Sequence, residues 1–459
     1  DPKIEKRPDG TVLVTVPVKA KIDAAFRYTE VKPGAREEIV FQLTRDARNQ
    51  WRISHLDDGV VMSPSNFRVL YRRVPLYFAS SDGTQLVPDV RWFPNDNTAT
   101  YAVSALLDGP SPWLRDGVRT GAPEGAKLST TAVTVSTGLE ASVDLSANVG
   151  KGADINLLQA QLEATLLRLP GVKSVAVSVG GVPWRADHVP DLARDVQPTN
   201  GPFLLQDDRL AVLDRGKVVP VEDAAPLTGL DARTPALSPD ETVRVVLSGT
   251  TRLLLLPAGA AAPVTLTTGS HLVAPSVDRF GWTWTGEQTS TGQLTAVLPS
   301  GEVAVVGADL LNGRTIRSLR VARDGSRIAI AHTDAAGLDL VVDVAAVVRD
   351  ETGRPQLLGE TPLQVGAVLD DATELAWVDE ATIAVLGRSG TISAPTVHLV
   401  PVGGPTETLP LMDRTSGIAA GRGDRTLFLA DEDGVLMSRQ STSWVPTGIT
   451  GVRDPVFPG

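Results

Sequence analysis

The chain has 459 residues, 42% of them hydrophobic, and 43 Lys and Arg against 54 Asp and Glu give a formal net charge of −11. This length predicts two to four domains, and the lack of a basic cluster argues against nucleic-acid binding, which needs positive charge to displace counterions. The sequence has no cysteine, which excludes disulfides and thiol nucleophiles, and no apolar run in it is long enough to span a bilayer.

Residues 1–72 have the pattern of long strands. The segment GTVLVTVPVKAKID alternates apolar and polar residues, and Ile39, Phe41 and Leu43 fall on one face of a second strand. A charged turn before Trp51 predicts a hairpin. Because so small a sheet cannot bury both of its faces alone, we interpret this region as the C-terminal part of an α+β domain. The stretch FQLTRDARNQWRIS resembles the closing strands of nuclear-transport-factor-2-like domains.

Residues 73–182 alternate strands and helices in the order ββαββαβ, which is typical of a small α+β domain. The first helix is predicted from Thr98 to Leu107, and four leucines recur at helical spacing within ADINLLQAQLEATLLRLPGV. The segment 183–202 is rich in Pro and Asp and is predicted to be a linker.

Residues 203–459 contain a repeat in which a polar, acidic turn precedes a short apolar strand. The repeats are SPDETVRVVLSG, SVDRFGWTWTG, ARDGSRIAIAHTD, WVDEATIAVLG and GRGDRTLFLADEDG. Their spacing is near the 40–50 residues of a propeller blade. The segment QDDRLAVLDRGKVVPV looks like the same unit without its first strand, and the tail RDPVFPG looks like that strand. We therefore predict an all-β propeller of six blades, closed by strands from both of its ends.

The loop ALLDGPSPWL has the order of a helix stop. Gly109 stands where a C-terminal cap glycine belongs and Pro110 cannot continue a helix, whereas a phosphate cradle needs a helix that starts after the glycines. Trp113 and Leu114 follow in a Gly/Pro-rich loop, where we expect an exposed position. We hypothesise that Gly109, Pro110, Trp113 and Leu114 form a domain or partner contact. The alternative is that the Trp113 ring folds back over the edge of its own domain.

Catalytic and metal chemistry have no recognisable motif. The five histidines show no i,i+2 or i,i+4 pairing and are His55, His188, His271, His332 and His398. Acidic pairs could hold calcium or act as acid and base, but each lies in a turn, where aspartate caps backbone groups: Asp57-Asp58, Asp207-Asp208, Asp370-Asp371 and Asp431-Glu432-Asp433. We predict that Trp282 and Trp284 pack within a blade, with ligand stacking as the alternative. No G-x-S-x-G or S-x-x-K motif occurs. We predict no catalytic residue, no metal and no cofactor.

The blocks ALLDGPSPWL, APEGAKL and VDLS occur in the order found in GerMN domains, which the middle region resembles. With a partial domain before it and a propeller after it, the whole chain resembles the actinobacterial lipoprotein LpqB family, and the terminal FPG agrees with that family's propeller. No catalytic residues follow from this resemblance.

The resemblance implies a non-enzymatic accessory lipoprotein outside the cytoplasm. It would be held to the outer face of the cell membrane by an N-terminal lipid that lies outside this sequence. The implied partner is the extracytoplasmic sensor domain of the histidine kinase of the MtrA–MtrB two-component system, in the control of cell-wall homeostasis and division. The alternative function is a propeller that binds or hydrolyses a cell-wall sugar or peptide, which a buried carboxylate pair at one mouth of the propeller would favour.

Overall fold

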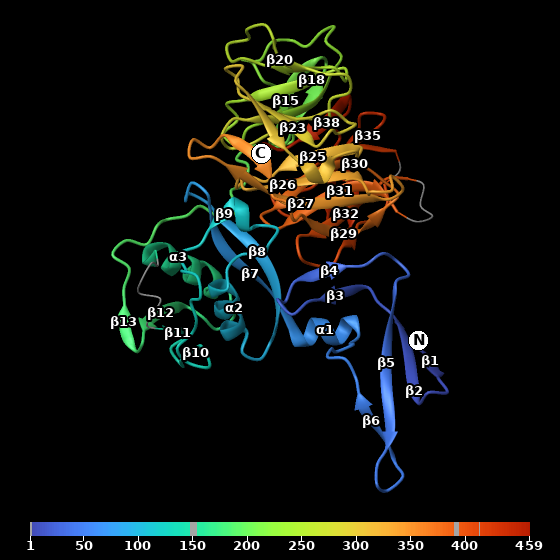
Figure 1. The fold of residues 1–459 in the computed structure, drawn as a ribbon. Coiled ribbons are helices and arrows are strands. Elements are labelled where there is room, and N and C mark those ends of the chain that lie inside the picture. The colour runs from blue at the N-terminus through green and yellow to red at the C-terminus, as the bar shows by residue number, and fades with distance from the viewer. Residues whose placement is uncertain (1, 147–153, 390–393, 413) are drawn as a thin grey trace.

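The computed structural model describes residues 2–146, 154–389, 394–412 and 414–459. Figure 1 shows three parts in chain order: a strand-rich N-terminal arm, an α+β domain and a β-propeller. The predicted fold class, a multidomain chain with an α+β domain before an all-β propeller, is confirmed. No helix in the described ranges is long and apolar enough to cross a membrane.

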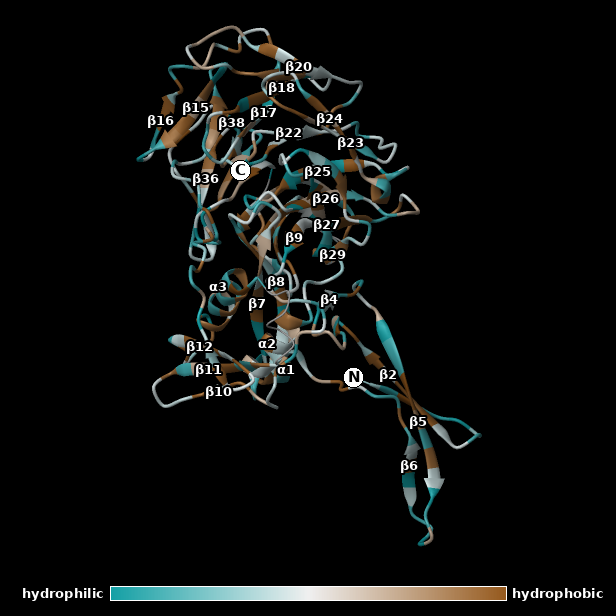
Figure 2. Cartoon of the chain, turned by 60° about the vertical axis from the view of Figure 1, so that its left-hand side comes forward, coloured by the Kyte–Doolittle hydropathy of each residue, from teal (hydrophilic) through white to brown (hydrophobic). Residues whose placement is uncertain are grey.

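The N-terminal arm contains a four-stranded antiparallel sheet in the order β1-β2-β5-β6, a small hairpin of β3 and β4, and one short helix. Their bounds are β1 Lys3–Lys6, β2 Thr11–Pro17, β3 Ala20–Ile22, β4 Tyr28–Glu30, β5 Arg36–Arg45, β6 Trp51–His55 and α1 Pro64–Leu70. The predicted hairpin is confirmed, because β5 and β6 pair with Arg45 opposite Trp51. The sheet projects away from the rest of the molecule (Figures 1 and 2).

The arm has almost no core of its own. Leu13 and Tyr28 are the two buried hydrophobic side chains among residues 2–63, whereas Ile4 and Ile53 are 63% and 57% exposed. A single sheet cannot cover both of its faces, and this is the physical reason for the exposure.

The α+β domain has two sheets, in the orders β8-β7-β9 and β10-β11-β12-β13, with two helices packed on them. Their bounds are β7 Tyr71–Ser80, β8 Leu86–Pro94, α2 Thr98–Leu107, the 3₁₀ helix η1 Arg115–Gly117, β9 Val118–Arg119, β10 Thr134–Val135, β11 Glu140–Leu145, α3 Ile155–Leu166, β12 Ser174–Val179 and β13 Val182–Trp184. Helix α3 begins after Asp154, whose carboxylate accepts the Leu157 N–H at 3.1 Å, a typical N-cap. The last strand, β13, extends two residues into the segment that the sequence places in the linker.

The propeller has six four-stranded blades within the described residues, and their inner strands contact one another in a closed ring. From the axis outward the strands are β38 Val452–Val456, β14 Phe203–Gln206, β15 Arg209–Asp214 and β16 Lys217–Pro220 in blade 1; β17 Ala232–Leu237, β18 Arg244–Ser248, β19 Arg252–Leu255 and β20 Val264–Thr268 in blade 2; β21 Ser276–Val277, β22 Thr283–Thr285, β23 Gln293–Val297 and β24 Val303–Gly307 in blade 3; β25 Ile316–Val321, β26 Arg327–Thr333, β27 Leu340–Arg349 and β29 Leu363–Leu369 in blade 4; β30 Asp371–Asp379, β31 Thr382–Arg388, β32 Thr396–Pro401 and β33 Glu407–Thr408 in blade 5; β34 Thr415–Ala419, β35 Phe428–Asp431, β36 Leu436–Gln440 and β37 Ser443–Pro446 in blade 6. A further strand, β28 Pro355–Leu358, pairs with β24 and β27 and joins blades 3 and 4.

The ring is closed as the sequence predicts. Strand β38, from the C-terminal tail, pairs antiparallel with β14, with Phe203 opposite Val456 and Gln206 opposite Val452. Blade 1 therefore contains strands from both ends of the propeller sequence, and its inner edge is not left unpaired.

The other two parts pack against the propeller. The β3–β4 segment of the arm contacts blades 4 and 5, where Lys32 forms an ion pair with Asp339 at 2.5 Å and the Thr406 N–H donates to Glu30 at 3.0 Å. One hydrophobic cluster runs from the α+β domain into blades 4 and 5. The domains thus share a core across their contact.

Candidate functional site

The loop that the sequence singles out begins where α2 ends. Gly109 has a φ of +92°, a left-handed backbone that glycine adopts without strain. Its N–H donates to the Leu106 carbonyl at 3.2 Å, and Pro110 follows. The segment therefore stops the helix, as predicted. The carbonyl end of the helix precedes the loop, and this polarity disfavours a bound phosphate.

Trp113 and Leu114 are buried, with 4% and 0% of their surface exposed. The expectation that Trp113 emerges at the surface is therefore wrong. The cause is Asp89 in the middle of β8, which accepts hydrogen bonds from the Ser111 N–H at 2.8 Å and from the Ser111 hydroxyl at 3.0 Å. Arg91 compensates the buried charge of Asp89 with an ion pair at 2.7 Å. These bonds hold the loop against the sheet, and a contact with a partner protein stays a prediction.

An aspartate inside the apolar strand LVPDVRWF is the signal that sequence reasoning missed. A buried carboxylate needs hydrogen-bond donors close by, and the N–H groups of a polar loop can supply them.

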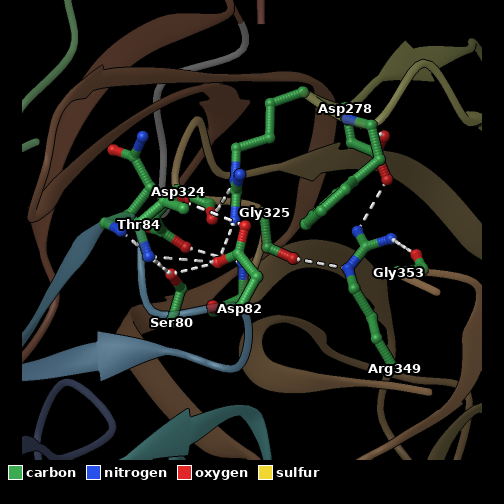
Figure 3. Close-up of polar contacts among 12 residues, drawn as sticks. Ser80, Asp82, Thr84, Asp278, Asp324, Gly325, Arg349 and Gly353 are labelled. Atoms are coloured by element: carbon green, nitrogen blue, oxygen red, sulfur yellow. Dashed lines mark hydrogen bonds and ion pairs between the residues drawn. The ribbon is translucent and has the colours of Figure 1, made fainter. Parts of the chain in front are cut away.

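A second group of polar residues lies at the junction between the α+β domain and the propeller (Figure 3). Asp82, in the turn between β7 and β8, accepts hydrogen bonds from Ser80 at 2.6 Å and Thr84 at 2.9 Å, and forms an ion pair with Arg279 of blade 3 at 2.7 Å. Burial opposes ionisation of Asp82, but the hydrogen bonds from Arg279, Ser80 and Thr84 hold its pKa below the ordinary value. Arg279 also donates to the Asp324 carbonyl at 2.8 Å, so the turn is bound to two blades.

Arg349 supports this junction from inside the propeller. Figure 3 shows it between Asp278, Gly325 and Gly353. It pairs with the Asp278 carboxylate at 2.6 Å and donates to the Gly325 and Gly353 carbonyls at 3.0 and 2.9 Å. Because both charged side chains are at most 1% exposed, each one compensates the buried charge of the other.

Tyr77 and Glu380 connect the same two domains at a second point. The Tyr77 hydroxyl donates to Glu380 Oε1 at 2.7 Å, and Arg194 from the segment after β13 donates to the Tyr77 hydroxyl at 3.3 Å. Burial raises the pKa of Tyr77, and the Glu380 charge adds to that rise. Burial also raises the pKa of Glu380. The Tyr77 hydroxyl therefore stays protonated and keeps donating to the carboxylate.

A small cavity lies beside Glu380. Its polar lining is Gln85, Asp195, Arg323, Asp324, Arg327, Asp379 and Glu380. In the described chain, Arg327 Nη1 and Glu380 Oε2 have no hydrogen-bond partner. The cavity can therefore hold about one water molecule, which would accept a hydrogen bond from Arg327 and donate one to Glu380.

A second small cavity lies on the propeller axis among the inner strands. Its charged groups are Arg320 and Glu374, which pair at 3.4 Å, and Glu374 also accepts the Ile418 N–H at 2.9 Å. Burial raises the pKa of Glu374 to about 7, although the Arg320 charge opposes the rise. Near neutral pH this carboxyl group is therefore partly protonated.

Asp454 lies near Glu374 on the other side of Gly417. A Cβ placed on Gly417 would lie 3.6 Å from Glu374 Oε2 and 3.8 Å from Asp454 Cα. Burial raises the pKa of Asp454, and the Asp454 charge contributes to the raised pKa of Glu374. The inner strands thus bring the Glu374 carboxyl group and the Asp454 backbone to the same glycine, although the two residues are 80 positions apart in the sequence.

Four of the remaining candidate residues have structural contacts. Asp431 caps its turn, accepting the Val435 N–H at 2.8 Å, and His332 pairs with Asp343 at 2.9 Å. Trp282 and Trp284 are 4% and 0% exposed and pack in the core of their blade. Across the described ranges no three His, Asp or Glu side chains are grouped so as to hold a metal ion.

Three family models match the chain in the order of its parts. The lipoprotein LpqB N-terminal domain matches residues 1–68, the sporulation and spore germination family matches 75–184, and the lipoprotein LpqB β-propeller domain matches 208–458. The propeller match alone spans more than half of the chain. The chain belongs to the lipoprotein LpqB family.

Relatives of this LpqB-family chain match nearly all of it. Lipoprotein LpqB of Thermobifida fusca is 26% identical over 99% of this chain and 82% of its own length, and that of Streptomyces coelicolor is 27% identical over 98% and 80%. The resemblance drawn from the sequence motifs is confirmed. Among solved structures, the tandem GerMN domains of GerM from Bacillus subtilis align with 30% of this chain and 58% of that chain, at 16% identity and a TM-score of 0.22. A likeness this weak carries no argument.

Proposed function

We propose that this LpqB-family protein is a non-enzymatic accessory lipoprotein at the outer face of the cell membrane. It binds the extracytoplasmic sensor domain of an MtrB-like histidine kinase and modulates its signalling in cell-wall homeostasis and division. The family supports the lipoprotein character, and the resemblance stated for the sequence supplies the kinase.

The observation that carries the proposal is how charged side chains are used where the α+β domain meets the propeller. Asp82 pairs with Arg279, and Glu380 accepts a hydrogen bond from Tyr77, across this contact. Both carboxylates therefore hold the two domains together. A rigid body that presents several surfaces suits a binding partner of another protein.

The test is calorimetric titration of the 459-residue chain with the purified sensor domain. Three matched variants place an aspartate on an exposed apolar position of each part: Ile53→Asp in the arm, Leu167→Asp in the α+β domain and Val305→Asp in the propeller, which are 57%, 45% and 59% exposed. The variant on the binding surface should weaken affinity by about tenfold or more, since a charge buried against a partner costs over 1.4 kcal/mol. No binding by the unmodified chain would refute the proposal.

A second function is favoured by the axial carboxyl group of Glu374. This group is largely buried and the charge of Asp454 contributes to its raised pKa, an arrangement that suits a propeller binding or hydrolysing a cell-wall sugar or peptide. The pairing of Glu374 with Arg320 and Ile418 weighs against it, because both carboxylate oxygens already have partners. Titration with soluble cell-wall fragments separates the two functions. Binding heat that the unmodified chain gives and the Glu374→Gln variant does not give would support the second function.

A further inference from the structure

The far end of the N-terminal arm concentrates positive charge on an acidic protein. We define the arm tip as residues 6–10 and 44–52, two turns at the same end of the sheet, where the Leu43 N–H donates to the Gly10 carbonyl at 3.3 Å. The basic residues of the arm tip, all exposed, are Lys6, Arg7, Arg45, Arg48 and Arg52, and its acidic residues are Asp9 and Asp46. Five positive and two negative charges give the arm tip a net charge of +3, whereas the whole chain has −11.

An exposed tryptophan stands beside these charges. Trp51 is 54% exposed, and the Arg45 guanidinium lies 4.7 Å from the centre of its ring. Tryptophan is enriched at membrane–water interfaces, where its amphipathic ring sits at the headgroup level. Lysine and arginine are attracted to the negative surface potential of anionic lipids. The arm tip presents both features together.

The hairpin turn of the arm tip is held in one conformation. The Asp46 carboxylate accepts the Arg48 and Gln50 N–H groups at 2.9 and 3.0 Å, and forms an ion pair with Arg52 at 3.0 Å. Arg45 donates to the Asn49 side chain at 2.6 Å. Among the described residues Arg48 takes part in no ion pair, so its charge is available to an outside ligand. An ordered turn loses little conformational entropy on binding.

The position of the arm tip agrees with a membrane contact. The arm points away from the propeller and lies in the N-terminal part of the chain (Figures 1 and 2).

We propose that the arm tip binds the phosphate headgroups of an anionic bilayer through its basic side chains, with Trp51 at the headgroup level. This goes beyond the binding of a kinase, since it assigns the arm tip to the membrane. The contact would orient the molecule so that the propeller projects away from the bilayer.

The test is co-sedimentation of the 459-residue chain with vesicles of phosphatidylcholine alone or of phosphatidylcholine with phosphatidylglycerol. The unmodified chain should bind the anionic vesicles only, and added salt should weaken that binding. The double variant Arg7→Glu, Arg48→Glu should lower the partition coefficient by about 30-fold or more, since each basic side chain near an anionic surface contributes about fivefold.

The control is Arg209→Glu, Arg215→Glu, which makes the same change of charge at two exposed arginines of blade 1 and should bind like the unmodified chain. Equal melting temperatures of both variants check that they fold. Equal binding of the two double variants, or equal binding of the unmodified chain to both kinds of vesicle, would overturn the membrane site.

Titration with the sensor domain, without vesicles, keeps this test separate from the proposed function. The arm-tip variant should retain the affinity of the unmodified chain for the sensor domain. If it loses that affinity while vesicle binding is unchanged, the arm tip is a protein contact and the membrane proposal is wrong.

Discussion

Replacing Asp278 with alanine should strongly destabilise the propeller. Its two oxygens accept four hydrogen bonds, from the Phe280 and Trp282 N–H groups at 2.9 and 3.0 Å, from the Trp284 ring at 2.8 Å and from Arg349 at 2.6 Å. The Asp278 carboxylate has no exposed surface. Alanine would therefore leave a buried guanidinium without its counterion, together with three unsatisfied N–H groups.

The expected loss of unfolding free energy follows from the buried charge. Removing one partner of a buried ion pair costs about 3–5 kcal/mol, because the other charge stays desolvated. The N–H groups left without a partner push the loss toward the upper end of that range. The double variant Asp278→Leu, Arg349→Met removes both charges together. It should cost less than either single variant, since replacing a buried pair with apolar groups of similar size is often close to neutral.

The assay is thermal unfolding by calorimetry together with urea titration. Asp214→Ala is the control, since that side chain is 62% exposed and should change stability by less than about 0.5 kcal/mol. A loss below about 1 kcal/mol for Asp278→Ala would refute the reasoning, as would a double variant less stable than both single variants.

Three other changes test separate parts of the structure. Burial raises the pKa of Glu374 to about 7 from an ordinary 4.5, so the native state holds a proton that the unfolded state has lost, and stability should fall by about 3 kcal/mol as the pH rises between those values. Glu374→Gln should remove this decline, and an unaltered pH profile would contradict the assignment. Deleting residues 452–459 removes the buried Val452 and Phe457, which should cost about 2–3 kcal/mol each, and an unchanged melting temperature would argue against closure. Trp113→Ala should lower the unfolding free energy by about 3–5 kcal/mol, whereas reduced affinity for the sensor domain at an unchanged melting temperature would indicate a partner contact instead.

The sequence by itself determines the local elements and their order. Period-two and helical patterns, with glycine and proline at the ends, specify α2 and the β5–β6 hairpin, because these depend on neighbouring residues. The blade repeat predicts the propeller, because each complete repeat is built from consecutive strands. It also predicts the closure, because the first unit lacks one strand and the C-terminal tail has the pattern of that strand.

The tertiary structure decides which polar residues meet. The Glu374 carboxyl group and the Asp454 backbone both approach Gly417, and Asp82 meets Arg279 at the domain junction, although long stretches of chain separate each pair. The burial of Trp113 likewise depends on Asp89, a residue of another element that holds the loop against the sheet. Sequence patterns predict the face of its own helix or strand on which a residue lies. The partners of a buried charge are set by how the elements pack, because that charge is stable only where packing brings a counterion or a donor to it.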